Sequence, residues 1–179
     1  MMTLENTMLV VIDVQGNLAQ AMYEKEGLFK NLGKIIKGAQ ILEMPILVTE
    51  QVPEKLGPTL PEIAGLLTGI RPITKSSFSC CGNDDFVKEL KMINRRQIIV
   101  TGIEAHVCVY QTTIDLIDSG YEVNLVADCI SSRTLMNKTI GIESMIHKGA
   151  MLTSTEMALF ELMKIAKGDA FSKIIKIVK

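Results

Sequence analysis

The chain has 179 residues, of which 47% are hydrophobic and 22% charged, and its formal net charge is -1. This composition is typical of a globular protein, and the length predicts a single domain over residues 1–179. Because lysines and arginines are spread along the sequence, charge predicts no surface for nucleic acid or for a membrane. No apolar run approaches the roughly 20 residues that span a bilayer, so we expect no membrane segment.

The start of the chain and its cysteines and histidines indicate the cellular location and whether a zinc site is to be expected. The opening segment, MMTLENT, has neither the basic patch nor the cleavage site of a signal peptide. The cysteines make neither a CxxC pair nor the framework of a disulfide-rich secreted protein; they are Cys80, Cys81, Cys108 and Cys129. These features predict a reducing, cytoplasmic location, and the two histidines offer little for a zinc site.

In the first half of the chain, short apolar runs typical of strands alternate with segments whose apolar residues have the spacing of a helix. Met8–Ile12 and Ile46–Thr49 are apolar runs of strand length, and Leu28–Leu42 between them has the apolar stripe of a helix. The segment Glu50–Pro61 carries three prolines and a glycine, which predicts a loop. A brief helix is expected over residues 61–67.

The second half continues this alternation. Ile73–Lys75 is weakly strand-like, and Asn83 or Asp84 is expected to cap a helix that runs to about Met92. The next predicted elements are alternately strand and helix: Gln97–Thr101, Val107–Asp118, Glu122–Ala127, Leu135–Lys148, Ala150–Thr153 and Thr155–Ile165. The tail, FSKIIKIVK, predicts either a final amphipathic turn or an edge strand. The order predicts an α/β fold, a doubly wound parallel six-stranded sheet with helices on both faces.

Ligands of such a sheet bind beyond the carboxyl ends of its strands, near the point where strand order reverses. At those ends the sequence has Asp13, Glu50, Lys75, the segment Gly102–Cys108 and Asp128. Neither GxGxxG nor GxxxxGK[ST] occurs there, so no phosphate cradle for a nucleotide cofactor is predicted. A carboxylate, an amine and a thiol are expected to meet instead.

Each of these three groups has a structural explanation and a catalytic one. Asp13 could cap a turn, Lys75 could be a solvated lysine, and Cys108 could be a small apolar filler. As a set they predict nucleophilic catalysis, because a helix amino terminus and an ammonium favour the thiolate and lower its pKa. A nearby carboxylate could accept the thiol proton and later activate water.

Three motifs relate the chain to a known family. They are VIDVQ, which ends at Gln15, TKSSFS at Thr74–Ser79 and VTGIEAHVCV at Val100–Val109, and the segment YEVNLVADCISSR continues the match. Over nearly its whole length the chain resembles the isochorismatase-like superfamily of cysteine hydrolases, which includes nicotinamidases and N-carbamoylsarcosine amidase. The loop Glu50–Pro61 is most similar to the poorly characterised isochorismatase-domain branch.

The resemblance implies a catalytic triad of Asp13, Lys75 and Cys108 within one isochorismatase-like hydrolase domain. It also implies a cis peptide bond between Ile103 and Glu104. That bond would aim the backbone N–H groups of Glu104 and Cys108 at one point, where they would form an oxyanion hole.

Departures from the family narrow the expected function. The loop TEQVPEKLGPTLPEI lacks the histidines of the nicotinamidase metal site, so we expect no metal and no other cofactor. Cys108, which true isochorismatase lacks, favours acyl transfer. The other three cysteines are expected to serve packing, or a subunit contact in the case of Cys80 and Cys81. The resemblance also implies a homo-oligomer, with residues 63–70 and the tail as candidate contacts.

The sequence therefore predicts a hydrolase that cleaves a small amide or related C–N substrate through a thioester on Cys108. Gln15, Glu50, Gln51 and Phe78 are candidates for substrate contact, although Gln15 fits a buried structural amide equally well. The alternative is a non-catalytic binding or regulatory module that retains the triad. Besides further copies of the chain, a small molecule is the expected partner.

Overall fold

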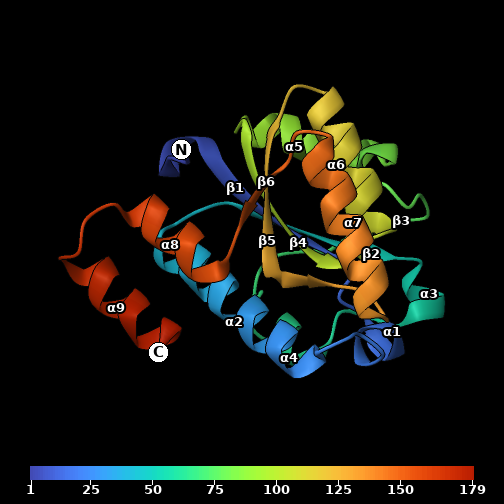
Figure 1. Ribbon diagram of the computed structural model, residues 1–179, viewed down its shortest axis with the longest axis horizontal. Helices are drawn as coiled ribbons and strands as arrows, with labels where there is room; N and C mark the ends of the chain where they lie inside the picture. The colour runs from blue at the N-terminus through green and yellow to red at the C-terminus, as the bar shows by residue number, and fades with distance from the viewer.

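Six parallel strands form the centre of the molecule (Figure 1). In the computed structural model, which describes residues 1–179, they lie in the order β3-β2-β1-β4-β5-β6. The strands are β1 (Thr7–Ile12), β2 (Ile46–Gln51), β3 (Ile73–Lys75), β4 (Gln97–Ile103), β5 (Glu122–Ser131) and β6 (Met151–Thr153). The order reverses between β1 and β4, so the carboxyl ends of these two strands mark the expected ligand site. The predicted six-stranded parallel sheet is confirmed.

Helices cover both faces of this sheet (Figure 1). Helices α2, α4, α8 and α9 lie on one face, and α5, α6 and α7 lie on the other. The α-helices are α1 (Gly16–Gln20), α2 (Lys25–Ile41), α3 (Pro53–Leu56), α4 (Pro61–Ala64), α5 (Asp84–Ile93), α6 (Cys108–Asp118), α7 (Leu135–His147), α8 (Thr155–Met163) and α9 (Asp169–Val178). Two single 3-10 turns, η1 (Leu4–Asn6) and η2 (Cys80–Gly82), complete the secondary structure.

Each face of the sheet has its own apolar core, because the strands of a covered parallel sheet are buried on both sides. Strand β1, TMLVVI, is buried at every position. Leu9 and Val11 belong to the core that includes Leu32 of α2. Val10 belongs to the core that includes Phe86 of α5. This division follows from the strand period of two, and it explains why β1 reads as an unbroken apolar run.

Strand β5 is longer than the sequence predicts. The pattern ends at Ala127, yet the strand continues to Ser131, so Asp128 and Cys129 lie within it rather than beyond it. The Oδ1 atom of Asp128 accepts hydrogen bonds from the backbone N and the Oγ1 of Thr155, at 2.9 and 3.0 Å. A charged residue is therefore accommodated inside the strand by the first residue of α8.

The segment predicted as a loop, Glu50–Pro61, is partly ordered into regular structure. Strand β2 extends through Gln51, and α3 begins at Pro53. Proline is tolerated at the first helical position because its N–H has no partner there, so the prolines do not exclude a short helix. The tail forms helix α9 rather than an edge strand, and its Ile174 is buried in the core beside α2.

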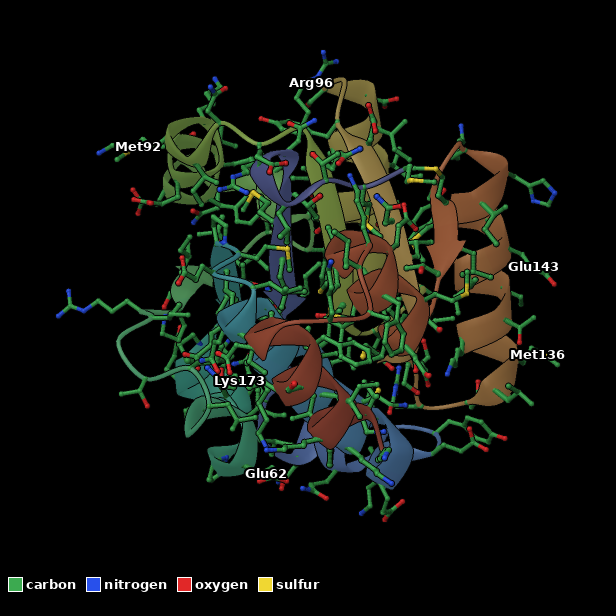
Figure 2. The ribbon with its side chains drawn as sticks, turned by 90° about the vertical axis from the view of Figure 1, so that its left-hand side faces the viewer. Glu62, Met92, Arg96, Met136, Glu143 and Lys173 are labelled. Atoms are coloured by element: carbon green, nitrogen blue, oxygen red, sulfur yellow. The ribbon has the colours of Figure 1, made fainter.

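The apolar segments that the sequence suggests as subunit contacts serve the chain's own core. Ile63, Leu67 and Ile174 are all buried. The large apolar side chains that remain exposed are concentrated instead on α7, β6 and the start of α8: Leu135, Met136, Ile140, Ile146, Met151, Leu152 and Met157. Met136 projects outward from α7 in Figure 2. No helix combines the length and the apolar character needed to cross a membrane.

Candidate functional site

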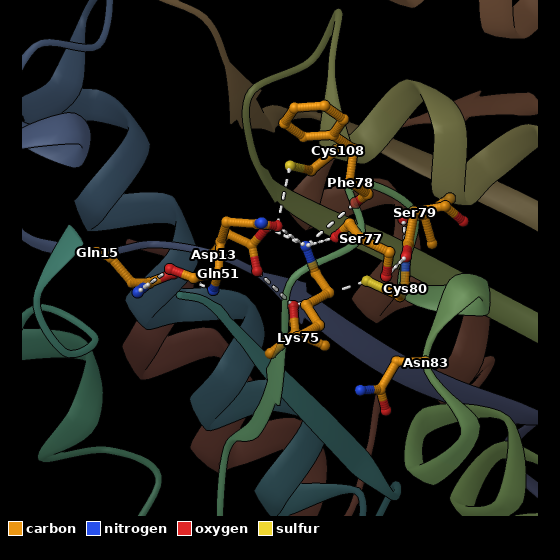
Figure 3. A network of polar contacts seen from close by, with 12 residues as sticks. Asp13, Gln15, Gln51, Lys75, Ser77, Phe78, Ser79, Cys80, Asn83 and Cys108 are labelled. Atoms are coloured by element: carbon orange, nitrogen blue, oxygen red, sulfur yellow. Dashed lines mark hydrogen bonds and ion pairs between the residues drawn. The ribbon is translucent and has the colours of Figure 1, made fainter. Parts of the chain in front are cut away.

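The carboxylate of Asp13 lies at the carboxyl end of β1 and is almost completely buried (Figure 3). The backbone of Asp13 adopts a left-handed conformation, with φ of 52°, directly after the strand. Its Oδ1 accepts a hydrogen bond of 2.7 Å from the hydroxyl of Thr49 on β2. Its Oδ2 accepts one of 2.6 Å from the Nζ of Lys75, the last residue of β3. Three neighbouring strands therefore position one carboxylate.

Lys75 is a buried cation, not a solvated surface lysine, and its residue is only 2% exposed. Besides Asp13, its ammonium donates to the side-chain Oε1 of Gln51 at 2.7 Å. It also donates to the backbone carbonyls of Ser77 and Phe78, at 3.2 and 3.1 Å. Figure 3 shows these four acceptors around the ammonium. Burying a lysine in this way is favourable only because its charge is neutralised and its protons are all hydrogen-bonded.

Cys108 is the first residue of α6 and is 7% exposed. Its Sγ lies 4.0 Å from the Oε1 of Gln51, the atom that also accepts from Lys75. The thiol and Asp13 line the same cavity. The structure thus brings the three residues of the predicted triad to one rim of the sheet, with Gln51 between the amine and the sulfur (Figure 3).

The pKa of the Cys108 thiol is shifted in the direction opposite to the one that the sequence predicts. Burial and, after it, the negative charge of Asp13 raise this pKa to about 12, and the ammonium of Lys75 offsets only part of the effect. The resting side chain is therefore a neutral thiol beside a carboxylate, because the cavity disfavours a second anion.

Residues 104–107, which we call the nucleophile loop because the sequence predicts Cys108 to be the nucleophile, connect β4 to the cysteine. The peptide bond between Ile103 and Glu104 is cis. The carbonyl of Glu104 accepts hydrogen bonds from the N–H groups of Val107 and Val109, at 3.0 and 3.2 Å. The N–H groups of Glu104 and Cys108 have no acceptor within the chain. Two residues of the cavity lining thus have backbone donors that are free to bind a ligand.

The end of β5 holds the nucleophile loop in place, a role that the sequence analysis misses. The N–H of Ala105 donates to the carbonyl of Ser131 at 2.8 Å. The Oε1 of Glu104 accepts from both the N–H and the Nε of Arg133, at 3.2 and 3.0 Å. The motif CISSR contains these residues, but a strand assigned only to Ala127 ends too early to reach the loop.

A cavity of about 100 Å³ opens onto the thiol. Polar groups from Asp13, Gln51 and Glu104 reach it. Its remaining wall is apolar and comes from Leu18 of α1, Leu56 of α3, Phe78, Ile103, Val107 and Cys108 itself. Of the four candidate substrate contacts, Gln51 and Phe78 line this cavity.

The other two candidates do not line the cavity. Gln15 is fully buried: its Nε2 donates to the carbonyls of Gln51 and Gly57, and its Oε1 accepts from the N–H of Gln51. It is therefore a structural amide. The Oε1 of Glu50 accepts from the N–H and the hydroxyl of Thr59, both at 2.7 Å, which fixes the segment after β2. Glu50 and Gln51 diverge because successive strand side chains point to opposite faces.

All four cysteines are free thiols. Cys80 is buried 3.7 Å from the hydroxyl of Thr49, and Cys129 lies 3.1 Å from the hydroxyl of Thr155. Burial raises the pKa of both thiols, that of Cys80 to about 11. These environments match the packing role expected for both residues. No group of three or more His, Cys, Asp or Glu side chains is arranged to hold a metal ion.

Sequence and structure both relate this chain to one family of α/β proteins. Residues 7–157 match the model of the Isochorismatase domain, and the chain therefore belongs to the isochorismatase family. Isochorismatase domain-containing protein 2 of Xenopus laevis is 33% identical over 174 residues, which are 97% of this chain and 83% of that protein. The family suggested by the motifs is thereby confirmed.

Solved structures extend this relationship to the fold. The MAR1 ribonuclease of Caenorhabditis elegans has a TM-score of 0.93 at 32% identity, and the match covers 99% of this chain and 91% of that one. The YcaC gene product of Escherichia coli, an octameric hydrolase of unknown specificity, has the same TM-score at 20% identity, with coverage of 98% and 89%. The second likeness shows that the fold persists when most of the sequence has changed.

Proposed function

We propose that this protein is a cysteine hydrolase that cleaves a small amide, or a related C–N substrate, through an acyl thioester on Cys108. The observation that carries the proposal is the presence of the Cys108 thiol and the Asp13 carboxylate at one cavity, with the Lys75 ammonium bound to that carboxylate. Membership of the isochorismatase family supports hydrolysis as the reaction class. An activated nucleophile generally requires a base within reach and a third group that orients the base, and the thiol, the carboxylate and the ammonium correspond to these three parts.

In the proposed first half-reaction, Asp13 removes the proton of the Cys108 thiol as the sulfur attacks the carbonyl carbon. A C–S bond forms, and the carbonyl electron pair moves to oxygen. The raised pKa of the thiol supports transfer of the proton during attack rather than a stored thiolate. When the oxygen lone pair re-forms the carbonyl, the C–N bond breaks and Asp13 returns the proton to the leaving amine.

In the second half-reaction, water attacks the thioester. Asp13 accepts a proton from this water, the C–S bond breaks, and the proton passes to the departing sulfur. Lys75 holds the Asp13 carboxylate in place and balances its charge through their 2.6 Å contact. The free N–H groups of Glu104 and Cys108 are suited to bind the oxyanion of each tetrahedral intermediate. One such donor typically contributes about 100- to 1000-fold in rate.

The proposal is tested by assaying a panel of small amides and ureides for release of ammonia or amine. Cys108→Ala is expected to abolish turnover, and intact-mass spectrometry of the wild type is expected to detect an acyl adduct on Cys108. The matched control is Cys81→Ala, which makes the same change outside the cavity and is expected to retain activity. Turnover by Cys108→Ala at the wild-type rate would exclude the covalent mechanism.

A second candidate is phosphodiester hydrolysis of RNA, which the MAR1 ribonuclease of Caenorhabditis elegans favours through its 32% identity. The cavity offers less support, because it is small and no cation lines it to bind a phosphate. Adding a single-stranded RNA to the panel separates the two candidates. Cleavage of RNA that disappears in Cys108→Ala, without any amide turnover, would favour the second.

The chain is also proposed to form a homo-oligomer. An octamer is formed by YcaC of Escherichia coli, whose fold matches over 98% of this chain. The exposed apolar side chains of α7, β6 and the start of α8 form the surface best suited to such a contact, because water-exposed apolar area of this kind favours association.

A further inference from the structure

The cavity beside Cys108 has an apolar wall built by segments far apart in sequence. Leu18 comes from α1, Leu56 from α3 and Phe78 from the segment after β3. Ile103, just before the nucleophile loop, and Val107, its last residue, add apolar surface. An acyl group bound to the sulfur would therefore be surrounded mainly by carbon atoms, an environment that favours apolar substituents.

Every charged group at this cavity already has a partner. The ammonium of Lys75 is saturated by four oxygen acceptors, with Asp13 the closest at 2.6 Å. The carboxylate of Glu104 is paired with Arg133. No cation lines the cavity, so nothing there is suited to bind an anionic substituent of a substrate. Such a substituent would lie near the two carboxylates without compensation, and an uncompensated buried charge is strongly unfavourable.

The cavity is also small. Its volume of about 100 Å³ is well below the roughly 300–1,000 Å³ of pockets that hold drug-sized ligands. A substrate whose reacting carbonyl lies at the Cys108 sulfur has space for a short chain and not for an aromatic bicycle. Size and charge thus restrict the substrate independently of each other.

We infer that the site is selective for uncharged amides with short aliphatic acyl groups and discriminates against amides that carry a carboxylate. This inference rests on the proposed function, because it concerns the acyl group that Cys108 would accept. Leu18, Leu56 and Phe78 are the residues that determine this specificity. They contact the acyl chain and take no part in the bond-breaking steps, which the triad carries out.

Two substrates that differ mainly in charge test the effect of a carboxylate on turnover. Malonamate and 3-methylbutanamide are close in size, with a carboxylate in the first where the second has an isopropyl group. The expected kcat/KM for ammonia release is at least about 100-fold higher for 3-methylbutanamide. Equal rates, or preference for malonamate, would overturn the inference. A separate measurement, acylation of Cys108 by p-nitrophenyl acetate followed by intact mass, shows whether the nucleophile works at all.

These two measurements distinguish the possible failures. Acylation of Cys108 together with preference for malonamate would overturn the inference and leave the proposed hydrolase intact. Absence of acylation together with absence of amide turnover would overturn the proposed function and the inference with it. Acylation with preference for the neutral amide supports both.

A charge-reversal variant tests the assigned wall directly. Leu56→Lys introduces an ammonium into the apolar wall and is expected to shift the ratio of the two kcat/KM values at least about 10-fold toward malonamate. Leu18→Lys makes the same test from α1, should Leu56→Lys fail to fold. The control is Met92→Lys, at an exposed position of α5 outside both the cavity and the proposed subunit contact, which is expected to leave the ratio unchanged. A shift of the same size in the control, or none in either wall variant, would contradict the assignment.

Discussion

Lys75 is the residue on which the charge balance of the site depends. It is buried, and it neutralises a buried carboxylate at 2.6 Å while three further oxygens accept its remaining protons. Removing one member of such a pair leaves the other charge without compensation in a medium of low polarity. Stability and catalysis should therefore depend on the same contact.

We expect Lys75→Met to lower the free energy of unfolding by about 3–5 kcal/mol, because Asp13 then remains as a buried, unpaired carboxylate. The double variant Asp13→Asn with Lys75→Met is expected to lose less than the sum of the two single changes. Urea denaturation of the four proteins measures this coupling. Strictly additive losses would show that the ion pair does not act as a unit.

The Cys108 thiol also gives a pH-dependent prediction. Because burial and the charge of Asp13 raise its pKa to about 12, the thiolate fraction should still be rising well above the ordinary cysteine pKa of about 8.5. The rate of alkylation by iodoacetamide, followed by mass spectrometry of the Cys108 peptide, is expected to increase roughly tenfold per pH unit from pH 7 to 10.

Asp13→Asn provides the control for this measurement. The variant removes a negative charge that raises the pKa of the thiol, so the alkylation profile is expected to move to lower pH. A plateau in the wild type below pH 8.5 would contradict the environment described for Cys108 and would support a stored thiolate.

At the scale of elements, the nucleophile loop is held from two sides. The end of β5 binds it through Ser131 and Arg133. On the side of α7, Gly141 lies so close that an added Cβ would be 2.7 Å from the carbonyl oxygen of Ala105 and 2.9 Å from the N–H nitrogen of His106. The position of α7 therefore limits where the loop, and with it Cys108, can lie.

Gly141→Ala is expected to force the loop and α7 apart, lowering the free energy of unfolding by about 1–3 kcal/mol and reducing turnover. The matched control is Gly27→Ala in α2, where no atom lies within 4 Å of an added Cβ. That variant is expected to stabilise the protein by about 0.5–1 kcal/mol, because alanine favours a helix over glycine. Unchanged activity and stability in Gly141→Ala would show that the loop does not depend on this close contact.

Much of the fold could be predicted from the sequence, because its central strands are buried on both faces and carry unbroken apolar runs such as MLVVI. Strand ends were less predictable. Asp128 interrupts the apolar pattern of β5, and its side chain is bound by Thr155, which is distant in the sequence. Helix α1 has five residues and no capping side chain, so it could not be predicted from the local sequence.

The meeting of Asp13, Lys75 and Cys108 at one rim of the sheet was predictable, because residue types at strand ends point to it. The site was not predictable where it depends on contacts between distant segments. In the sequence, Gln51 stands just after a predicted strand and nothing marks it as a bridge. It lies between Lys75 and Cys108 only because β2 and β3 pair. The raised pKa of the thiol has the same origin, because burial depends on the whole cavity.

At the scale of the whole molecule, the exposed apolar face of α7 and β6 should control assembly. Met136→Lys is expected to lower the molar mass measured by light scattering after size exclusion, because a charge then replaces an apolar contact between copies. The matched control is Met92→Lys on α5, on another side of the molecule in Figure 2, which is expected to keep the mass of the wild type. A wild-type mass in both variants would place the interface elsewhere.

The strand order has a consequence for synthesis on the ribosome. Strands β1 to β3 are complete once Lys75 has been made, but β1 then has a partner on one edge only, since β4 supplies the other. A chain arrested before β4 would hold the acid and the amine without the sulfur. It would also present the apolar strand TMLVVI with a free hydrogen-bonding edge to other nascent chains, the arrangement that promotes aggregation.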